Sequence, residues 1–155
     1  MRAVVQRALG ASVVVEGAVV GAFEGPGLVV LVGATHGDTA DDAEKLAVKV
    51  HELRIFGPEH AAAPLEDGRR ELSAAELGLP LLVISQFTLY GDTRKGRRPS
   101  WTAAAPGPVA EPLVDHVVAV LRERGATVGT GVFGADMKVS FTNDGPITVL
   151  VEVGA

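Results

Sequence analysis

The chain has 155 residues, of which 47% are hydrophobic and 21% are charged, and its formal net charge is −5 at pH 7. These values are typical of one globular domain that folds without a metal or a disulfide, and they exclude an intrinsically disordered chain. The absence of cysteine also excludes thiolate nucleophiles and zinc sites built on thiolates. No apolar run reaches the ~20 residues of a membrane span, and the first residues lack the apolar core of a signal peptide. We therefore expect a single cytoplasmic domain over 1–155, without membrane contact.

The first third of the chain is predicted to form short β-strands, because β-branched residues alternate there with glycine-containing turns. These strands cover 3–9, 12–16, 18–23 and 28–32. Glu16-Gly17 is expected at the turn of a hairpin. The next stretch predicts an amphipathic helix, since Thr39 and Asp42 form a capping-box pattern ahead of an apolar stripe at helical spacing.

The remaining elements are less regular. The stretch 57–80 mixes Pro, Gly, Ala and charge, which indicates a loop or a weak hairpin. LLVISQFTL (81–89) predicts a buried strand that becomes polar at its end. A second helix is expected over about 108–124, with Gly125 ending it. Three further strands are predicted at 127–130, 137–142 and 147–153. This order favours an α/β fold with a mixed sheet and two helices covering one face.

A basic loop follows the polar strand end. Four of the 14 basic residues stand within five positions, at Arg94, Lys95, Arg97 and Arg98. On an acidic chain, such a patch favours a specific contact with a polyanion over indiscriminate binding. A solvated loop without a partner is the alternative.

Side chains that carry common catalytic chemistry are sparse. The four histidines (His36, His51, His60 and His116) are scattered without the spacing of metal ligands, and GATHG (33–37) lacks the spacing and the lysine of a phosphate-binding loop. The carboxylates Asp92, Asp136 and Asp144 are equally typical of turns. A hydrolase with a side-chain nucleophile would depend on Ser85 or Thr88, and no base is evident for either. We expect no metal and no cofactor.

Five segments together carry a resemblance. They are VVQRA (4–8), LRIF (53–56), SQFTLYGDTRKGRRPS (85–100), FGADMKV (133–139) and NDGPIT (143–148). In this order they resemble the D-aminoacyl-tRNA deacylase family essentially from end to end, with SQFTL and Gly-Pro-x-Thr as its two signature motifs. The main departure is in 58–80, where RRELSAAELG replaces a commoner Lys-Met-Asn-x-Ser run.

The resemblance implies a homodimer, with active sites at the subunit interface, that hydrolyses the ester joining a D-amino acid to the 3′-terminal adenosine of tRNA. The achiral glycyl group is also implied as a substrate. The fold implied is a strongly curved, barrel-like sheet. Gly145-Pro146 is expected to be a cis peptide that reaches the partner's site near Thr88 and rejects L-side chains sterically. Arg7 is expected to stabilise this loop, and Met137 to form an apolar wall.

The SQFTL motif is expected to supply the catalytic half of the site, from Ser85, Gln86, Phe87 and Thr88. Backbone N–H groups near Phe87 and Thr88 suit an oxyanion. Because the motif contains no His or Lys to activate Thr88, water is favoured as the attacker, with the terminal 2′-OH of tRNA as an assisting group and Thr88 positioning the adenosine. The basic loop would contact tRNA phosphates.

Two readings from other classes stay open. One is an esterase or peptidase with Ser85 or Thr88 as its nucleophile. The other is a non-catalytic RNA-binding module, which is disfavoured because Trp101 is the only aromatic residue in or beside the basic loop that could stack on bases.

Overall fold

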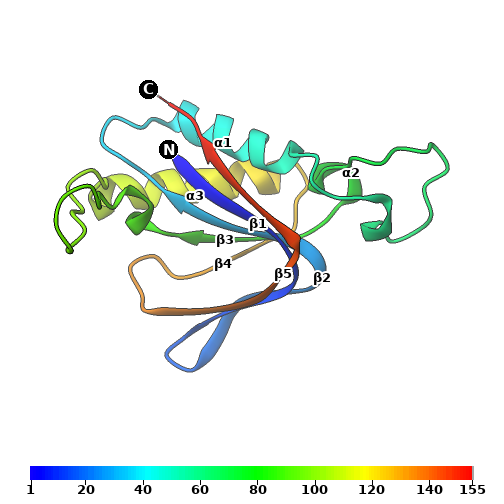
Figure 1. The fold of residues 1–155 in the computed structure, drawn as a ribbon, viewed down its shortest axis with the longest axis horizontal. Coiled ribbons are helices and arrows are strands. Elements are labelled where there is room, and N and C mark those ends of the chain that lie inside the picture. Colours follow the sequence, from blue (N-terminus) through cyan, green and yellow to red (C-terminus); the bar gives the residue numbers. More distant parts are fainter. Residues whose placement is uncertain (155) are drawn as a thin grey trace.

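The computed structural model describes residues 1–154, in which a five-stranded mixed sheet carries two long helices on one face (Figure 1). Strands β1 (Arg2–Val15) and β2 (Ala18–Gly33) form a long antiparallel hairpin. Strand β3 (Leu81–Ser85) runs parallel to β2, and β4 (Val128–Thr130) runs parallel to β3. Strand β5 (Met137–Glu152) pairs with the other side of β1. The order β4-β3-β2-β1-β5 confirms a mixed sheet but leaves two open edges, so the barrel-like curvature stays a prediction.

The two long helices are α1 (Ala40–Glu52) and α3 (Gly107–Glu123), which pack against each other and against the sheet. Helix α1 begins with the predicted capping box: the Thr39 hydroxyl accepts from the Asp42 amide, and the Asp42 carboxylate accepts from the Thr39 amide at 2.9 Å. The apolar stripes of α1 and α3 are buried against the sheet and form the larger core. No helix among residues 1–154 is long and apolar enough to cross a membrane.

Several strands that were predicted to be separate are continuous. Gly10 and Gly25 both have positive φ, near 70°, at an irregularity where the hairpin register shifts, so β1 and β2 continue through the predicted turns. The turn at Glu16-Gly17 is confirmed. The two predicted C-terminal strands likewise merge into β5, which turns sharply near its middle (Figure 1). The glycines predicted that the strands end at these positions, whereas pairing with a long neighbouring strand continues each strand past them.

The segment 57–80 is mostly the predicted loop, closed by an antiparallel bridge between Phe56 and Leu72. It also contains a 3-10 turn at Pro58–His60 and a one-turn helix α2 (Ala74–Leu77), which the sequence reading missed. The missed signal is a second capping box, in which the Ser73 hydroxyl accepts from the Glu76 amide and the Glu76 carboxylate accepts from the Ser73 amide.

A second, smaller core lies on the sheet face opposite the helices. Its fully buried members include Val13, Val29 and Ile84, and Met137 and Phe141 of β5 pack against it. Because side chains alternate along a strand, β3 contributes to both cores at once. This second core brings the start of β5 next to the end of β3, where the polar motif begins.

Candidate active site

The SQFTL motif leaves the sheet earlier than predicted. The Gln86 amide makes the last bond along this edge, to the Val32 carbonyl at 2.7 Å, and strand β3 ends at Ser85. Residues Phe87–Tyr90 then form a 3-10 helix instead of more strand. The reason is that β2 ends at Gly33, so a longer β3 would have no neighbour on that side.

This 3-10 helix leaves two backbone donors free. The first hydrogen bond of this helix runs from the Leu89 amide to the Gln86 carbonyl, and the Gly91 amide donates to the Thr88 carbonyl. Among residues 1–154, the amides of Phe87 and Thr88 donate to no acceptor, as is usual for the first residues of a helix. The predicted pair of donors is therefore present, at a helix start instead of a strand end.

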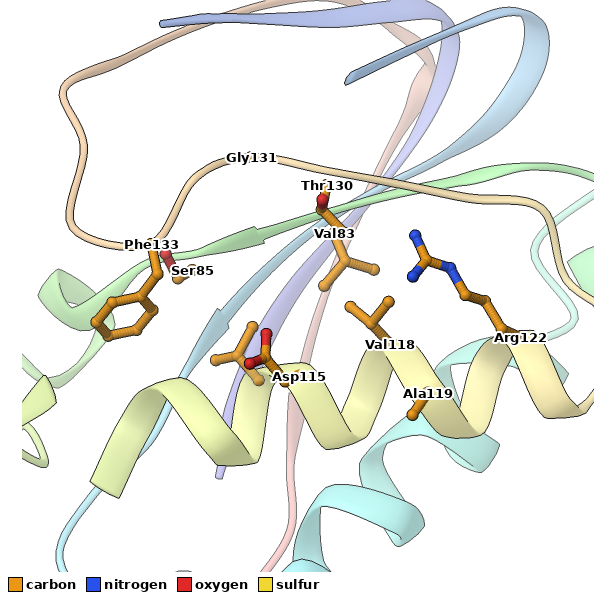
Figure 2. A pocket seen from close by; sticks show the side chains of 10 residues that line it. Val83, Ser85, Asp115, Val118, Ala119, Arg122, Thr130, Gly131 and Phe133 are labelled. Carbon is orange, nitrogen blue, oxygen red and sulfur yellow. The ribbon is translucent and has the colours of Figure 1, made fainter. Parts of the chain in front are cut away.

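Three cavities surround this motif, and Ser85 and Phe133 line all three. The first, the helix-side cavity, has a volume of about 240 Å³. Figure 2 shows Asp115, Val118 and Arg122 extending from α3 toward the strands, with Ser85 and Phe133 at one end. The Arg122 guanidinium donates to the Val128 carbonyl at 2.9 Å, so this arginine stabilises the connection from α3 into β4.

The second cavity, the tryptophan cavity, measures about 310 Å³. Its walls are mainly apolar and aromatic: Phe87 and Trp101 meet edge to face, with their ring centroids 5.5 Å apart, and Phe133 is a third aromatic residue of the wall. Gln86 adds a polar residue to the wall. Both Phe87 and Trp101 stay substantially exposed, at 55% and 43%. A planar apolar group has room beside these rings.

The third cavity, the methionine cavity, measures about 250 Å³ and lies between the motif and the start of β5. Its walls include Gln86, Phe87 and Met137. Thus Ser85, Gln86, Phe87 and Met137, which were predicted from two separate sequence segments, lie around one cavity. Phe133 was not predicted as a site residue, although it begins the FGADMKV segment that contributes to the family resemblance.

Thr88 lies outside these walls. It is exposed, lines none of the three cavities, and its hydroxyl accepts a hydrogen bond from the Gln86 side-chain amide. Within residues 1–154, no hydrogen bond joins the Ser85 or Thr88 hydroxyl to a His, Lys, Asp or Glu side chain. Residues 1–154 also contain no group of three or more His, Cys, Asp or Glu side chains that could hold a metal ion. The arrangement supports backbone-assisted chemistry better than an activated side-chain nucleophile.

The Gly-Pro motif forms a wide bulge in β5. Gln6 pairs with Thr148 and Ala8 pairs with Asn143, so four residues, 144–147, stand opposite Arg7 alone. Residues 1–154 contain no cis peptide bond, so the predicted cis Gly145-Pro146 peptide is wrong and the bond is trans. Gly145 turns the chain instead through its φ of 117°, which few other residues adopt.

Side chains hold this bulge from both flanks. Arg7 donates through Nε to the Asp144 carbonyl at 3.1 Å and through a terminal nitrogen to the Ile55 carbonyl at 2.7 Å. The Asn143 amide donates to the carbonyls of Arg7 and Ile147, each at 3.0 Å. The stabilising contact expected of Arg7 is therefore present. Among the described residues, none of 143–147 lines the three cavities of the same chain.

The basic loop follows directly after the 3-10 helix and is closed by backbone bonds between Asp92 and Ser100. Its predicted tRNA contacts Arg94, Lys95, Arg97 and Arg98 are all exposed. Arg94 is paired with Asp92 through two nitrogens, and these hydrogen bonds lower the pKa of the Asp92 carboxyl to about 2. The charge of Arg94 is therefore largely compensated within the loop.

Comparisons with known proteins agree with this picture. The family model described as D-Tyr-tRNA(Tyr) deacylase matches residues 4–152. A D-aminoacyl-tRNA deacylase of Streptomyces coelicolor is 65% identical over 153 residues, covering 99% of this chain and 100% of that protein. The enzyme of the same name from Acidothermus cellulolyticus is 61% identical, with 99% of each chain covered.

Two solved structures share this fold. A structure titled c-Myc DNA Unwinding Element Binding Protein is 35% identical, with a TM-score of 0.87 over 100% of both chains. A probable eukaryotic D-amino acid tRNA deacylase shares the fold with a TM-score of 0.80 over 98% of both chains, at 18% identity. From the family model and the extent of these identities, the chain belongs to the D-Tyr-tRNA(Tyr) deacylase family.

Proposed function

We propose that this protein hydrolyses the ester bond between a D-amino acid and the 3′-terminal adenosine of tRNA, which releases both and keeps D-amino acids out of translation. Glycyl-tRNA is a further substrate of the same site. The observation that carries the proposal is that the backbone amides of Phe87 and Thr88 donate to no acceptor in the described part of the chain and lie beside the tryptophan and methionine cavities. Membership of the deacylase family supports the same reaction.

The tryptophan cavity suits the adenosine. A nucleobase is flat and apolar on its faces, and it gains contact with the Phe87 and Trp101 rings beside which it would bind. The aminoacyl group would then extend past Gln86 into the methionine cavity, against Met137. This orientation brings the ester between the two cavities, next to the free amides.

The amides of Phe87 and Thr88 would stabilise the oxyanion that forms when water attacks the ester carbon. Such donors need no proton transfer of their own, so the absence of a base near Thr88 is compatible with catalysis. The terminal 2′-OH of tRNA assists the attack, and Thr88 positions the adenosine through the Gln86 side chain, which donates to the Thr88 hydroxyl and lines the tryptophan cavity.

Thr88→Ala tests this assignment. The variant is expected to retain measurable deacylation, because the backbone amide remains. Complete loss of activity, with folding and tRNA binding intact, would instead support Thr88 as a covalent nucleophile.

The Gly145-Pro146 bulge would complete the site of a partner subunit in a homodimer. It is separate from the cavities of its own chain, and it lies on the open edge strand β5. Leu9 and Leu150 near it are 47% and 58% exposed, which leaves apolar surface for a second copy. A rigid backbone at this point would exclude L-side chains by steric contact. With a trans bond, this exclusion depends on how firmly the bulge is held.

The deciding experiment is a deacylation time course with D-Tyr-tRNA and L-Tyr-tRNA in parallel. We expect rapid cleavage of the D-substrate and little cleavage of the L-substrate. Equal cleavage of both, or tRNA binding without cleavage of either, would contradict the proposal; the second result would favour the RNA-binding alternative. Labelling by a serine-reactive inhibitor would favour the side-chain nucleophile.

A further inference from the structure

We propose that His60 is a positioning residue: by binding Asp144 it holds the Gly145-Pro146 bulge in place, and it thereby sets the preference for D- over L-aminoacyl substrates. The His60 Nε2 atom lies 2.9 Å from Asp144 Oδ2, although the two residues are 84 positions apart. The His60 side chain is only 8% exposed. The inference rests on the proposed function, since it concerns the same substrates.

Polar contacts on both ring nitrogens fix the place of the His60 ring. The Nδ1 atom accepts from the Gly57 amide at 3.0 Å, and it also lies 3.2 Å from the Gly57 carbonyl oxygen and 3.5 Å from a Glu59 carboxylate oxygen. On the other side of the ring, Nε2 faces the Asp144 carboxylate at 2.9 Å and can donate to it. Phe56 meets the ring nearly at right angles, with centroids 5.3 Å apart. The ring thus has one orientation, and that orientation is directed at the bulge.

Asp144 receives contacts from two elements. Its Oδ2 atom lies 3.1 Å from Arg7 Nε of β1 and 2.9 Å from His60 Nε2 of the 58–60 turn. Its carbonyl accepts from Arg7 as well. The Arg7 guanidinium also binds the Ile55 carbonyl, so the segment 55–60 is connected to the bulge at two points. These contacts give a role to a part of the chain whose sequence predicts only a loop or a weak hairpin.

These contacts matter because the next residue is Gly145, and glycine can adopt more backbone conformations than any other residue. Without the bond to His60, Asp144 loses one of its two side-chain partners, and the bulge gains freedom to move. Displacements of about 1 Å at a substrate-positioning element are enough to change rates by large factors. A displaced bulge leaves room for the L-side chain that it otherwise excludes.

Two conservative variants separate the local and the long-range bond of His60. His60→Asn keeps an oxygen near the position of Nδ1, where it can accept from Gly57, but it is too short to reach Asp144. His60→Gln keeps a donor near the position of Nε2 and loses the bond to Gly57. Measured as kcat/KM with both Tyr-tRNAs, His60→Asn is expected to raise the L-to-D ratio about tenfold, and His60→Gln to restore most of the wild-type ratio.

The matched control is His116→Asn, the same substitution on α3, which is expected to leave the ratio unchanged. Asp144→Ala removes the other end of the bond at a more exposed site and is expected to raise the ratio to a similar extent. The double variant His60→Asn/Asp144→Ala should then add little beyond Asp144→Ala alone. This second set keeps the test decisive if His60→Asn does not fold.

The outcomes distinguish the two proposals. If the wild-type protein cleaves both substrates equally, the proposed function is wrong. If it discriminates and both His60→Asn and Asp144→Ala keep the wild-type ratio, the positioning role of His60 is wrong while the function stands. The positioning role is also wrong if His60→Asn and His60→Gln raise the ratio equally, because that result reports only a general loss of packing.

Discussion

Tyr90 ends the 3-10 helix of the catalytic motif, and its surroundings connect that helix to the sheet. The Arg2 guanidinium lies 4.7 Å from the centre of the Tyr90 ring and donates to the Leu89 carbonyl at 2.7 Å. Burial, aided by the negative charge of Asp38, raises the pKa of Tyr90 to about 12. Since this is the only tyrosine in the chain, its ionisation can be followed without interference.

We expect the phenolate absorbance of the folded protein to rise with a midpoint of about 12, against about 10 in urea. The folded state binds the phenolic proton more tightly than the unfolded state, so the associated stability is complete below about pH 10 and is lost as the pH rises toward 12. Asp38→Asn should lower the midpoint. A midpoint near 10 with retained circular dichroism would contradict the burial of this ring.

At the scale of elements, capping residues that are close in sequence decide where α1 and α2 begin. Thr39 caps α1 as its sequence pattern predicts, and α1 packs beside α3 over the larger core. Thr39→Ala is expected to lower the free energy of unfolding by about 1 kcal/mol, because the Asp42 amide loses its side-chain acceptor. Urea denaturation provides the measurement. Thr93→Ala, the same change in the exposed basic loop, should have almost no effect; equal losses would show that capping is not the cause.

At the scale of the whole molecule, the homodimer predicts complementation between two inactive variants. Ser85→Phe would fill the cavities around the motif. Gly145→Val would distort the bulge, since its φ of 117° disfavours a side chain and a Cβ there would collide with Arg7. A mixed dimer holds one site with a native cavity and a native bulge. Refolding the two variants together should therefore restore about one quarter of the wild-type activity. No restoration would contradict a site shared between subunits.

The charge of the basic loop predicts a second property of the whole molecule, which is salt-dependent recognition of tRNA. Raising the salt concentration should raise the KM, and Arg97→Ala should reduce the slope of log KM against log salt by about 0.7–0.9 if Arg97 binds one phosphate. Arg94→Ala should have a smaller effect, because Asp92 already compensates that charge. If charge reversal of Arg97 and Arg98 left the tRNA affinity unchanged, the loop would not be part of the tRNA interface.

Much of the molecule follows from its sequence alone. The capping box at Thr39, the apolar stripes of α1 and α3, and the turn at Glu16-Gly17 were predictable because each depends on residues only a few positions apart. The gathering of Ser85, Gln86, Phe87 and Met137 was anticipated through the family resemblance, since the motifs themselves are separated by about one third of the chain.

Only the tertiary structure decided the features that depend on distant partners. Strand β3 ends at Ser85 because its neighbour β2 ends, and β5 continues through the Gly-Pro motif because β1 pairs with both of its halves. The bond from His60 to Asp144 joins a loop to a strand 84 residues away, which no local pattern records. Local capping hydrogen bonds thus determined where α1 and α2 begin, whereas long-range pairing determined where the strands end and how the bulge is held.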